Sequence, residues 1–260
     1  MSSAKTNAQY DWDDFDVQSY FRQNYTNLIW EDRVLARQTI AALLELDIAF
    51  ESLTVGIDTC NGGVLRGPSL LAPFIRPDGS ILWSDIGEPQ LAHIEQIIET
   101  GKRGQLGIWE DHQHHMAACH AAWTNAGFRA CQLGKAIKQS IFDLPSQTYD
   151  IGITCFGPES LTEDRQEWEQ AILAFIQSIK PGQPVVMLYM VNSHGYNSPG
   201  LPFPATPIGQ QDMLAITADT LTNVQTFFVP DATQTARLEG EFLPYDGMAG
   251  IVGKTTRSSC

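Results

Sequence analysis

The sequence predicts an α/β fold in which a doubly wound, mostly parallel sheet carries a helical cap before its first strand. Three observations predict it. Short apolar runs alternate with amphipathic helical stretches from residue 53 onward, Gly/Pro-rich segments separate them, and an uninterrupted helical pattern precedes the first run. Strands that alternate with helices are typical of parallel sheets covered by helices. The apolar fraction of 43% in 260 residues is sufficient for a sizeable core.

The predicted domain organisation is simple. Residues 1–16 form an acidic lead that we expect to be mobile, with its acids solvated. Residues 17–260 form a single domain. Within it, residues 17–50 are the helical cap, since apolar residues recur at helical spacing and no Gly or Pro interrupts them. Residues 51–260 are the α/β core.

The core elements follow in order. A strand at 53–58 is apolar almost throughout, as expected for a strand buried on both faces. The later predictions are a turn at 76–79, a strand at 81–85 followed by a helix, a His- and Ala-rich helical middle at 105–136, strands at 136–142 and 149–156, a helix at 163–180, a strand at 184–191, a Pro/Gly-rich loop at 195–209, a helix near 210–222, and closing strands at 223–230 and 247–255. Ligands of such sheets bind beyond the carboxyl ends of the strands.

Charge and composition exclude several classes of partner. Thirty acids against 16 bases give a formal charge of -14, which argues against nucleic acid and against anionic membrane surfaces. No apolar run is long enough to span a membrane, and the polar N-terminus does not read as a secretory signal. Five scattered cysteines without a C-x-x-C pair favour free thiols in a reducing cytoplasm. Whether the chain is a monomer or a homodimer stays open.

Two motifs sit at the predicted ligand edge. The turn T-C-N-G-G follows the first strand, and Asp85 ends the second. A glycine turn lets a ligand approach the backbone, and a strand-terminal acid can accept hydrogen bonds from both hydroxyls of a ribose. Taken singly, they could be an ordinary turn and a helix N-cap. Taken together, they indicate a nucleoside cofactor, and neither G-x-G-x-x-G nor a P-loop motif is present.

The chain resembles class I S-adenosylmethionine (SAM)-dependent methyltransferases, most of all the nicotinamide, phenylethanolamine and indolethylamine N-methyltransferase family. Four stretches carry the resemblance: SYFRQNY (19–25), IDTCNGG (57–63), ILWSDIGEPQL (81–91), and the long segment from YDIGITCFGPES to KPGQPVVML (149–188). The first glycine of the family's turn is Cys60 here. The resemblance implies a seven-stranded Rossmann-like sheet, SAM as cofactor, and methyl transfer to a small molecule.

The resemblance also implies which residues hold the cofactor. They are Tyr20, Tyr25, Asp58, Cys60, Asn61, Gly62, Gly63, Asp85, Ile86, Gln90, Ser140, Ile141, Cys155 and Phe156. The tyrosines could equally be core aromatics of a helix. Which of Ser140, Ile141 and Asp143 meets the adenine stays open.

The acceptor is expected beyond the fourth and fifth strands. The resemblance implies Glu159 as an acid that helps bind an amine, and His194 could act as a general base. Tyr189, Asn192, Tyr196, Tyr245 and Asp246 are the expected substrate-binding residues. The segment 189–197 contains no acid, where the family has one, which points to a larger or neutral nitrogen acceptor such as an indole, amide or alkaloid of specialised metabolism.

Other functions are compatible with parts of the sequence. Residues 111–120 contain four histidines and Cys119 at helical spacings, but no H-E-x-x-H, so we predict no metal site. Transfer to carbon or oxygen is an alternative, as is a noncatalytic binding protein of the same fold, which Cys60 favours. An NAD-dependent oxidoreductase shares the glycine turn and the acid, but lacks the G-x-G-x-x-G fingerprint.

Overall fold

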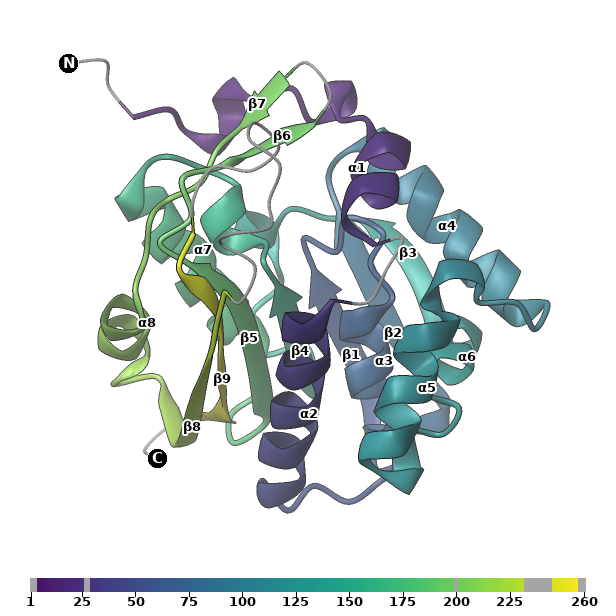
Figure 1. Cartoon of the computed structure of the whole chain (residues 1–260). Helices are drawn as coiled ribbons and strands as arrows, with labels where there is room; N and C mark the ends of the chain where they lie inside the picture. Colours follow the sequence, from purple (N-terminus) through teal and green to yellow (C-terminus); the bar gives the residue numbers. More distant parts are fainter. Residues whose placement is uncertain (1–3, 26–28, 199–200, 232–244, 257–260) are drawn as a thin grey trace.

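The computed structural model describes residues 4–25, 29–198, 201–231 and 245–256. Its main sheet has seven strands in the order β3-β2-β1-β4-β5-β9-β8 (Figure 1). Strands β1 to β5 pair in parallel, and β9 is antiparallel to both of its neighbours. The strands are β1 (Leu53–Thr59), β2 (Ile75–Asp85), β3 (Gly134–Lys138), β4 (Ile151–Cys155), β5 (Pro184–Val191), β8 (Leu221–Pro230) and β9 (Gly247–Thr255). The predicted fold class is confirmed.

Helices cover both faces of this sheet. They are α1 (Val17–Asn24), α2 (Trp30–Glu45), α3 (Arg66–Leu71), α4 (Glu88–Lys102), α5 (Glu110–Cys119), α6 (Ala126–Leu133), α7 (Arg165–Ser178) and α8 (Gln210–Thr217). Side chains alternate along β5, so Val186 and Leu188 pack in the core under α1 to α6, whereas Val185 and Met187 pack in the core under α7 and α8. Among the described residues, no helix combines the length and the apolar character needed to cross a membrane.

Several element boundaries differ from the sequence prediction. The single predicted cap helix is two helices, α1 and α2, and the predicted helical middle is α5 and α6 with short 3-10 turns beside them. The strand predicted over 136–142 ends at Lys138, because the Ser140 hydroxyl accepts a hydrogen bond from the Phe142 N–H (3.2 Å) and starts a 3-10 turn. The predicted turn at 76–79 lies inside β2, whose register against β1 shifts near Leu53.

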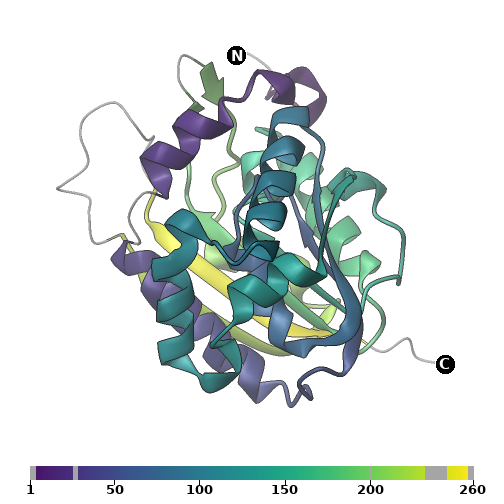
Figure 2. The ribbon, with the colours of Figure 1, turned by 90° about the vertical axis from the view of Figure 1, so that its right-hand side faces the viewer.

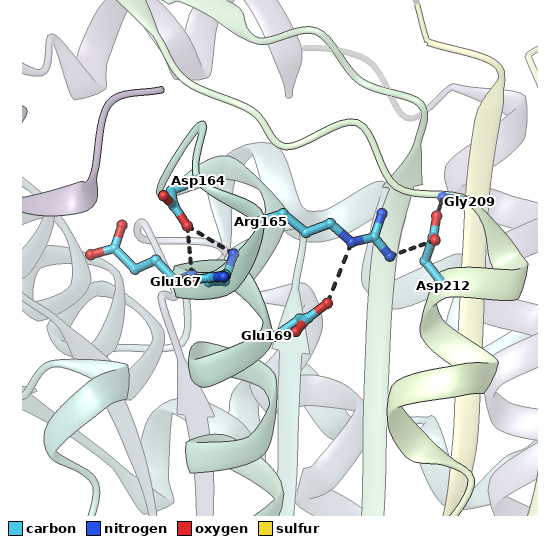
Figure 3. Close-up of polar contacts among 7 residues, drawn as sticks. Asp164, Arg165, Glu167, Glu169, Gly209 and Asp212 are labelled. Atoms are coloured by element: carbon cyan, nitrogen blue, oxygen red, sulfur yellow. Dashed lines mark hydrogen bonds and ion pairs between the residues drawn. The ribbon is translucent and has the colours of Figure 1, made fainter. Parts of the chain in front are cut away.

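The helices α7 and α8 are joined at their amino-terminal ends. Asp164 caps α7 by accepting hydrogen bonds from the N–H groups of Gln166 (2.8 Å) and Glu167 (3.0 Å) (Figure 3). Arg165 contacts Glu169 on its own helix and Asp212 on α8. These contacts hold the segment that follows β4 next to the carboxyl ends of the strands.

The N-terminal segment lies across the carboxyl-end edge of the sheet, beside the short hairpin β6 (Tyr196–Ser198) and β7 (Leu201–Phe203) (Figures 1 and 2). Within the acidic lead predicted over residues 1–16, the residues from Lys5 onward make contacts with the segment around α7. The N–H of Asn7 donates to Glu167 (2.7 Å) and the hydroxyl of Tyr10 to Glu163 (2.7 Å). Its acids are not merely solvated either, since Asp13 accepts from the Glu88 N–H (2.8 Å).

Candidate active site

A cavity of about 450 Å³ opens at the carboxyl ends of β1, β2, β4 and β5. This is the point where the strand order reverses around β1, as expected for a ligand site in a doubly wound sheet. Fourteen of the predicted residues line it: Tyr20, Tyr25, Cys60, Asn61, Gly62, Asp85, Ile86, Gln90, Ser140, Ile141, Cys155, Phe156, Tyr196 and Tyr245. Seven predicted residues do not line it: Asp58, Gly63, Glu159, Tyr189, Asn192, His194 and Asp246.

The turn after β1 is held by the side chain of Asn61. Its amide nitrogen donates to Asp58 (2.6 Å) and to the Val64 carbonyl (2.9 Å), while its amide oxygen accepts from the N–H groups of Gly63 (2.9 Å) and Val64 (3.0 Å). Asp58 is therefore part of the support under the turn and is not part of the cavity wall. Burial raises the pKa of the Asp58 carboxyl well above its ordinary value.

The two glycines of the turn face opposite ways. A Cβ atom at Gly62 would meet no atom within 4 Å, so the space beside this residue is open. A Cβ at Gly63 would lie 2.4 Å from a ring carbon of His93, so Gly63 packs against α4 and not against the cavity. Cys60 has φ +54°, a backbone conformation that costs a non-glycine residue about 1 kcal/mol or more. The turn thus has a left-handed backbone at Cys60, the position at which the resembled family has a glycine.

Asp85 joins the ends of β1 and β2. Its carboxylate accepts hydrogen bonds from the N–H groups of Gly62 (2.8 Å), Ile86 (2.8 Å) and Gly87 (3.3 Å). Burial raises the pKa of Asp85, and these backbone donors oppose the rise by stabilising the charged form. A carboxylate offers about four acceptor positions, so room remains for a ligand hydroxyl. Nearby, the buried side-chain oxygen of Gln90 has no partner among the described residues.

The cavity wall beyond β5, where the substrate-binding residues were expected, differs from the prediction. Strand alternation turns Tyr189 into the core under α7 and α8, away from Met190, which does line the cavity. Asn192, whose amide donates to Asp246 (2.6 Å), is exposed and lies off the cavity with its partner, and His194 is exposed as well. The residues of this wall that sequence reasoning did not identify are Met190 and Met248.

Glu159 lies behind the cavity wall. Its carboxylate accepts from the Met190 N–H (2.9 Å) and its carbonyl from the Thr206 N–H (2.8 Å), and it is 1% exposed. Burial raises the pKa of Glu159 to about 7, against that backbone hydrogen bond. The geometry gives Glu159 the part of a brace between the end of β4 and β5, with its charge close beneath the cavity.

Aromatic residues close the mouth of the cavity, and sequence reasoning missed three of the five named here: Trp12, Phe15 and Phe203. Phe15 lies 5.1 Å from Tyr20 and 5.0 Å from Phe203, and Tyr196 stacks on Phe203 at 5.5 Å between ring centroids. Trp12 lies 5.4 Å from Phe203, and its carbonyl accepts a hydrogen bond from Gln90 (3.3 Å). The N-terminal segment and the β6–β7 hairpin thus meet over the cavity through their rings.

A buried ion pair between Arg66 and Asp32 also lines the cavity. Arg66 opens α3 directly after the turn, and Asp32 comes from α2. The signal in the sequence was an arginine within the apolar stretch V-L-R-G-P-S-L-L, where only a paired charge is expected to be buried. A charged pair at this position was not predicted.

The His-rich segment does not form a metal centre among the residues that the structure describes. His115 contacts the Arg33 carbonyl (2.8 Å) and Cys119 (3.7 Å). His112 is buried beside Trp109, and burial keeps its pKa well below the ordinary value. The His-rich helix α5 packs between α2 and α6.

Comparisons by sequence give no relative: no family model and no curated protein matches the chain. Solved structures do match its fold. A proposed sarcosine dimethylglycine methyltransferase from Galdieria sulphuraria is 11% identical, with a TM-score of 0.55 over 92% of this chain and 98% of that one. The N-methyltransferase NodS from Bradyrhizobium japonicum is 13% identical, with a TM-score of 0.50 over 87% and 99%. The [4+2]-cyclase SpnF is 12% identical, with a TM-score of 0.54 over 91% and 86%. The chain therefore has the fold of class I SAM-dependent methyltransferases.

Proposed function

We propose that the protein is a SAM-dependent methyltransferase that acts on the nitrogen of a small molecule. One observation carries the proposal. The Asp85 carboxylate and the open face of Gly62 meet at the cavity, across the ends of the two strands at which this fold binds a nucleoside. Asp85 would accept from a ribose hydroxyl, Gln90 has a buried oxygen without a partner among the described residues, and Ser140 to Phe142 would cover the base.

The residues around the cavity suit this cofactor. Asp85 lines it and is held by backbone N–H groups and not by a cation, whereas Arg66 offsets the charge of Asp32, so the Asp85 carboxylate favours a cation such as a sulfonium. When bound, SAM supplies an electrophilic methyl group that a lone pair on the acceptor can attack in line. The chain's own contribution is to position the acceptor and to exclude water, for which the rings of Phe15, Tyr20 and Tyr196 are well placed.

The assignment of a nitrogen acceptor is supported by the resemblance and by the lining of the cavity. The resemblance to N-methyltransferases favours it, as does the fold shared with NodS. The aromatic and methionine wall formed by Tyr196, Tyr245, Met190 and Met248 suits a flat, largely apolar acceptor, in keeping with an indole or alkaloid nitrogen of specialised metabolism. With His194 and Glu159 off the cavity surface, we assign neither of them a proton-transfer role.

A second candidate is a protein that binds the nucleoside, or reshapes another ligand in this cavity, without consuming a methyl group. Two observations favour it. Cys60 stands where the resembled family has a glycine, and a protein with this fold, SpnF, is described as a [4+2]-cyclase. Fold alone does not separate the two functions.

Incubation with methyl-13C SAM and a panel of aromatic amines, indoles and amides tests the first proposal. We expect label on the acceptor nitrogen, read by NMR, and no transfer by Asp85→Ala. An O-methyl or C-methyl product would remove the nitrogen assignment. Binding of S-adenosylhomocysteine without transfer to any acceptor would favour the second candidate.

A further inference from the structure

Arg66 is the one cationic side chain among the described residues that line the cavity. It is 1% exposed, although arginine is seldom buried without partners for its donors. The acids of the cavity surface outnumber it, since both Asp32 and Asp85 lie there. Because Arg66 is the one cation of this lining, a ligand with a negative group would pair that group with Arg66.

The guanidinium group of Arg66 has donors to spare. It carries five N–H donors, and Nη2 donates to Asp32. Nε and Nη1 are buried and have no hydrogen-bond partner among the described residues. A buried donor without an acceptor costs about 1 to 3 kcal/mol, and more when the group is charged. An acceptor from beyond the described residues, such as a group of a ligand in the cavity, would remove this cost.

The residues around Arg66 hold its guanidinium group in place and give no acceptor to Nε and Nη1 among the described residues. Its guanidinium carbon lies 5.6 Å from the ring centroid of Phe156 and 6.0 Å from that of Tyr25. Both ring nitrogens of the buried His112 nearby also lack partners. Aromatic faces and a fixed acid orient a planar guanidinium, and a planar guanidinium matches the two oxygens of a carboxylate.

The position of the ion pair separates it from the nucleoside end of the cavity. Asp32 comes from α2, which packs on β8 and β9, whereas Asp85 and Ser140 follow β2 and β3 on the other side of the sheet's centre. Arg66 lies with Asp32 and beside the rings of Phe156 and Tyr25, all of which line the cavity. A negative group bound here would belong to the end of the ligand remote from the base.

We propose that Arg66 binds a carboxylate of a ligand held in this cavity, with Asp32 fixing the plane of the guanidinium. The inference rests on the proposed function, which places a nucleoside in the same cavity. Two ligands could bring the carboxylate: the amino-acid end of the nucleoside, or an acidic methyl acceptor. Both use the same chemistry, and the experiment below distinguishes them.

The first arm uses calorimetry with S-adenosylhomocysteine, its analogue without the carboxylate, and 5′-methylthioadenosine. If the nucleoside brings the carboxylate, the wild type prefers S-adenosylhomocysteine to the carboxylate-free analogue by tenfold or more. Asp32→Asn keeps this preference, because the amide oxygen can still accept from Nη2 and hold the plane of the guanidinium. The double variant Arg66→Met with Asp32→Leu, which leaves no buried charge unpaired, reduces it below twofold and still binds 5′-methylthioadenosine within threefold of the wild type. A merely structural ion pair would make Asp32→Asn and the double variant behave alike.

The second arm addresses the acceptor. Protein saturated with S-adenosylhomocysteine is titrated with indole-3-acetate and with indole-3-acetamide. Preference for the acid in the wild type and Asp32→Asn, lost in the double variant, assigns the carboxylate to the acceptor. No Arg66-dependent preference in either arm overturns the proposal. Failure of 5′-methylthioadenosine to bind the wild type would instead remove the nucleoside assignment, and the indole pair, titrated without nucleoside, would still decide the role of Arg66.

Discussion

The β1–β2 edge of the cavity and its β5–β9 edge are constructed from different kinds of contact. At the first edge, Asp85 accepts three backbone N–H groups and Asn61 ties four residues of one turn together. At the second edge, Tyr196 comes from β6 and meets the ring of Phe15, whereas Tyr245 lies just before β9 and Met248 at its start. At the first edge, hydrogen bonds to the backbone fix the positions of the polar side chains. At the second edge, apolar side chains fill the space, and substitutions by other apolar residues of similar size should be tolerated better.

The largest effect is expected at the polar edge, from filling the open face of Gly62. Gly62→Leu places a side chain where a Cβ meets no protein atom, so it should occupy the ligand's place and reduce affinity for S-adenosylhomocysteine more than 100-fold. Gly104→Leu is the matched control, because Gly104 also has a positive φ and open space but lies on the surface after α4. It carries the same backbone strain and should leave binding unchanged. Equal affinities in the two variants would place the ligand elsewhere.

The next prediction concerns the brace at the second edge. Because the pKa of Glu159 is raised to about 7 in the folded state, folding takes up a proton between pH 4.5 and 7, and this residue's contribution to stability falls as pH rises through that window. Glu159→Gln keeps the oxygen that accepts from Met190 and cannot ionise. We expect it to gain about 3 kcal/mol relative to the wild type between pH 4.5 and pH 8, measured by urea unfolding.

Glu163→Gln is the comparison for that experiment. The hydrogen bond from Tyr10 lowers the pKa of Glu163, so its contribution is complete above pH 4.5 and is lost only at lower pH. Its stability difference from the wild type should stay constant over the same window. A flat Glu159→Gln difference would show that the brace is not desolvated as described.

The two edges also differ in how much of each the sequence could predict. Asp85, Asn61 and Gly62 could be placed at the cavity from the sequence, because strand ends and turn residues are local signals. Gly63, Asp58 and Tyr189 were assigned to the site but face away from it, since a change of one residue in a turn or strand reverses the direction of a side chain. Trp12, Arg66 and Met248 were missed, because their places depend on contacts between distant segments.

Removing one of the aromatic rings that close the mouth of the cavity should have a moderate effect on ligand affinity. Trp12→Ala deletes a side chain that lines the cavity and packs on Phe203, so we expect about tenfold weaker binding of S-adenosylhomocysteine. Trp30→Ala serves as the control, since Trp30 is 51% exposed and does not line the cavity. Loss of affinity in both variants alike would point to a general loss of stability. Fluorescence of the remaining tryptophans on titration gives the affinity.

The smallest effect is expected at His194. It is exposed and does not line the cavity, so His194→Ala should change kcat with any methylated acceptor less than twofold, and the pH profile should not move. A loss of tenfold or more, or a shifted profile, would restore the role of general base that the sequence suggested and would place the acceptor nearer to β6.

Titration of S-adenosylhomocysteine into the wild type and into Asp85→Ala, by calorimetry, tests the central claim most directly. The account predicts one binding site in the wild type and affinity at least 30-fold weaker in the variant, because a charged acceptor of hydroxyl groups is removed. Circular dichroism confirms that both proteins are folded. Equal affinities, or no binding to the wild type at millimolar ligand, would contradict the placement of a nucleoside at this edge of the sheet.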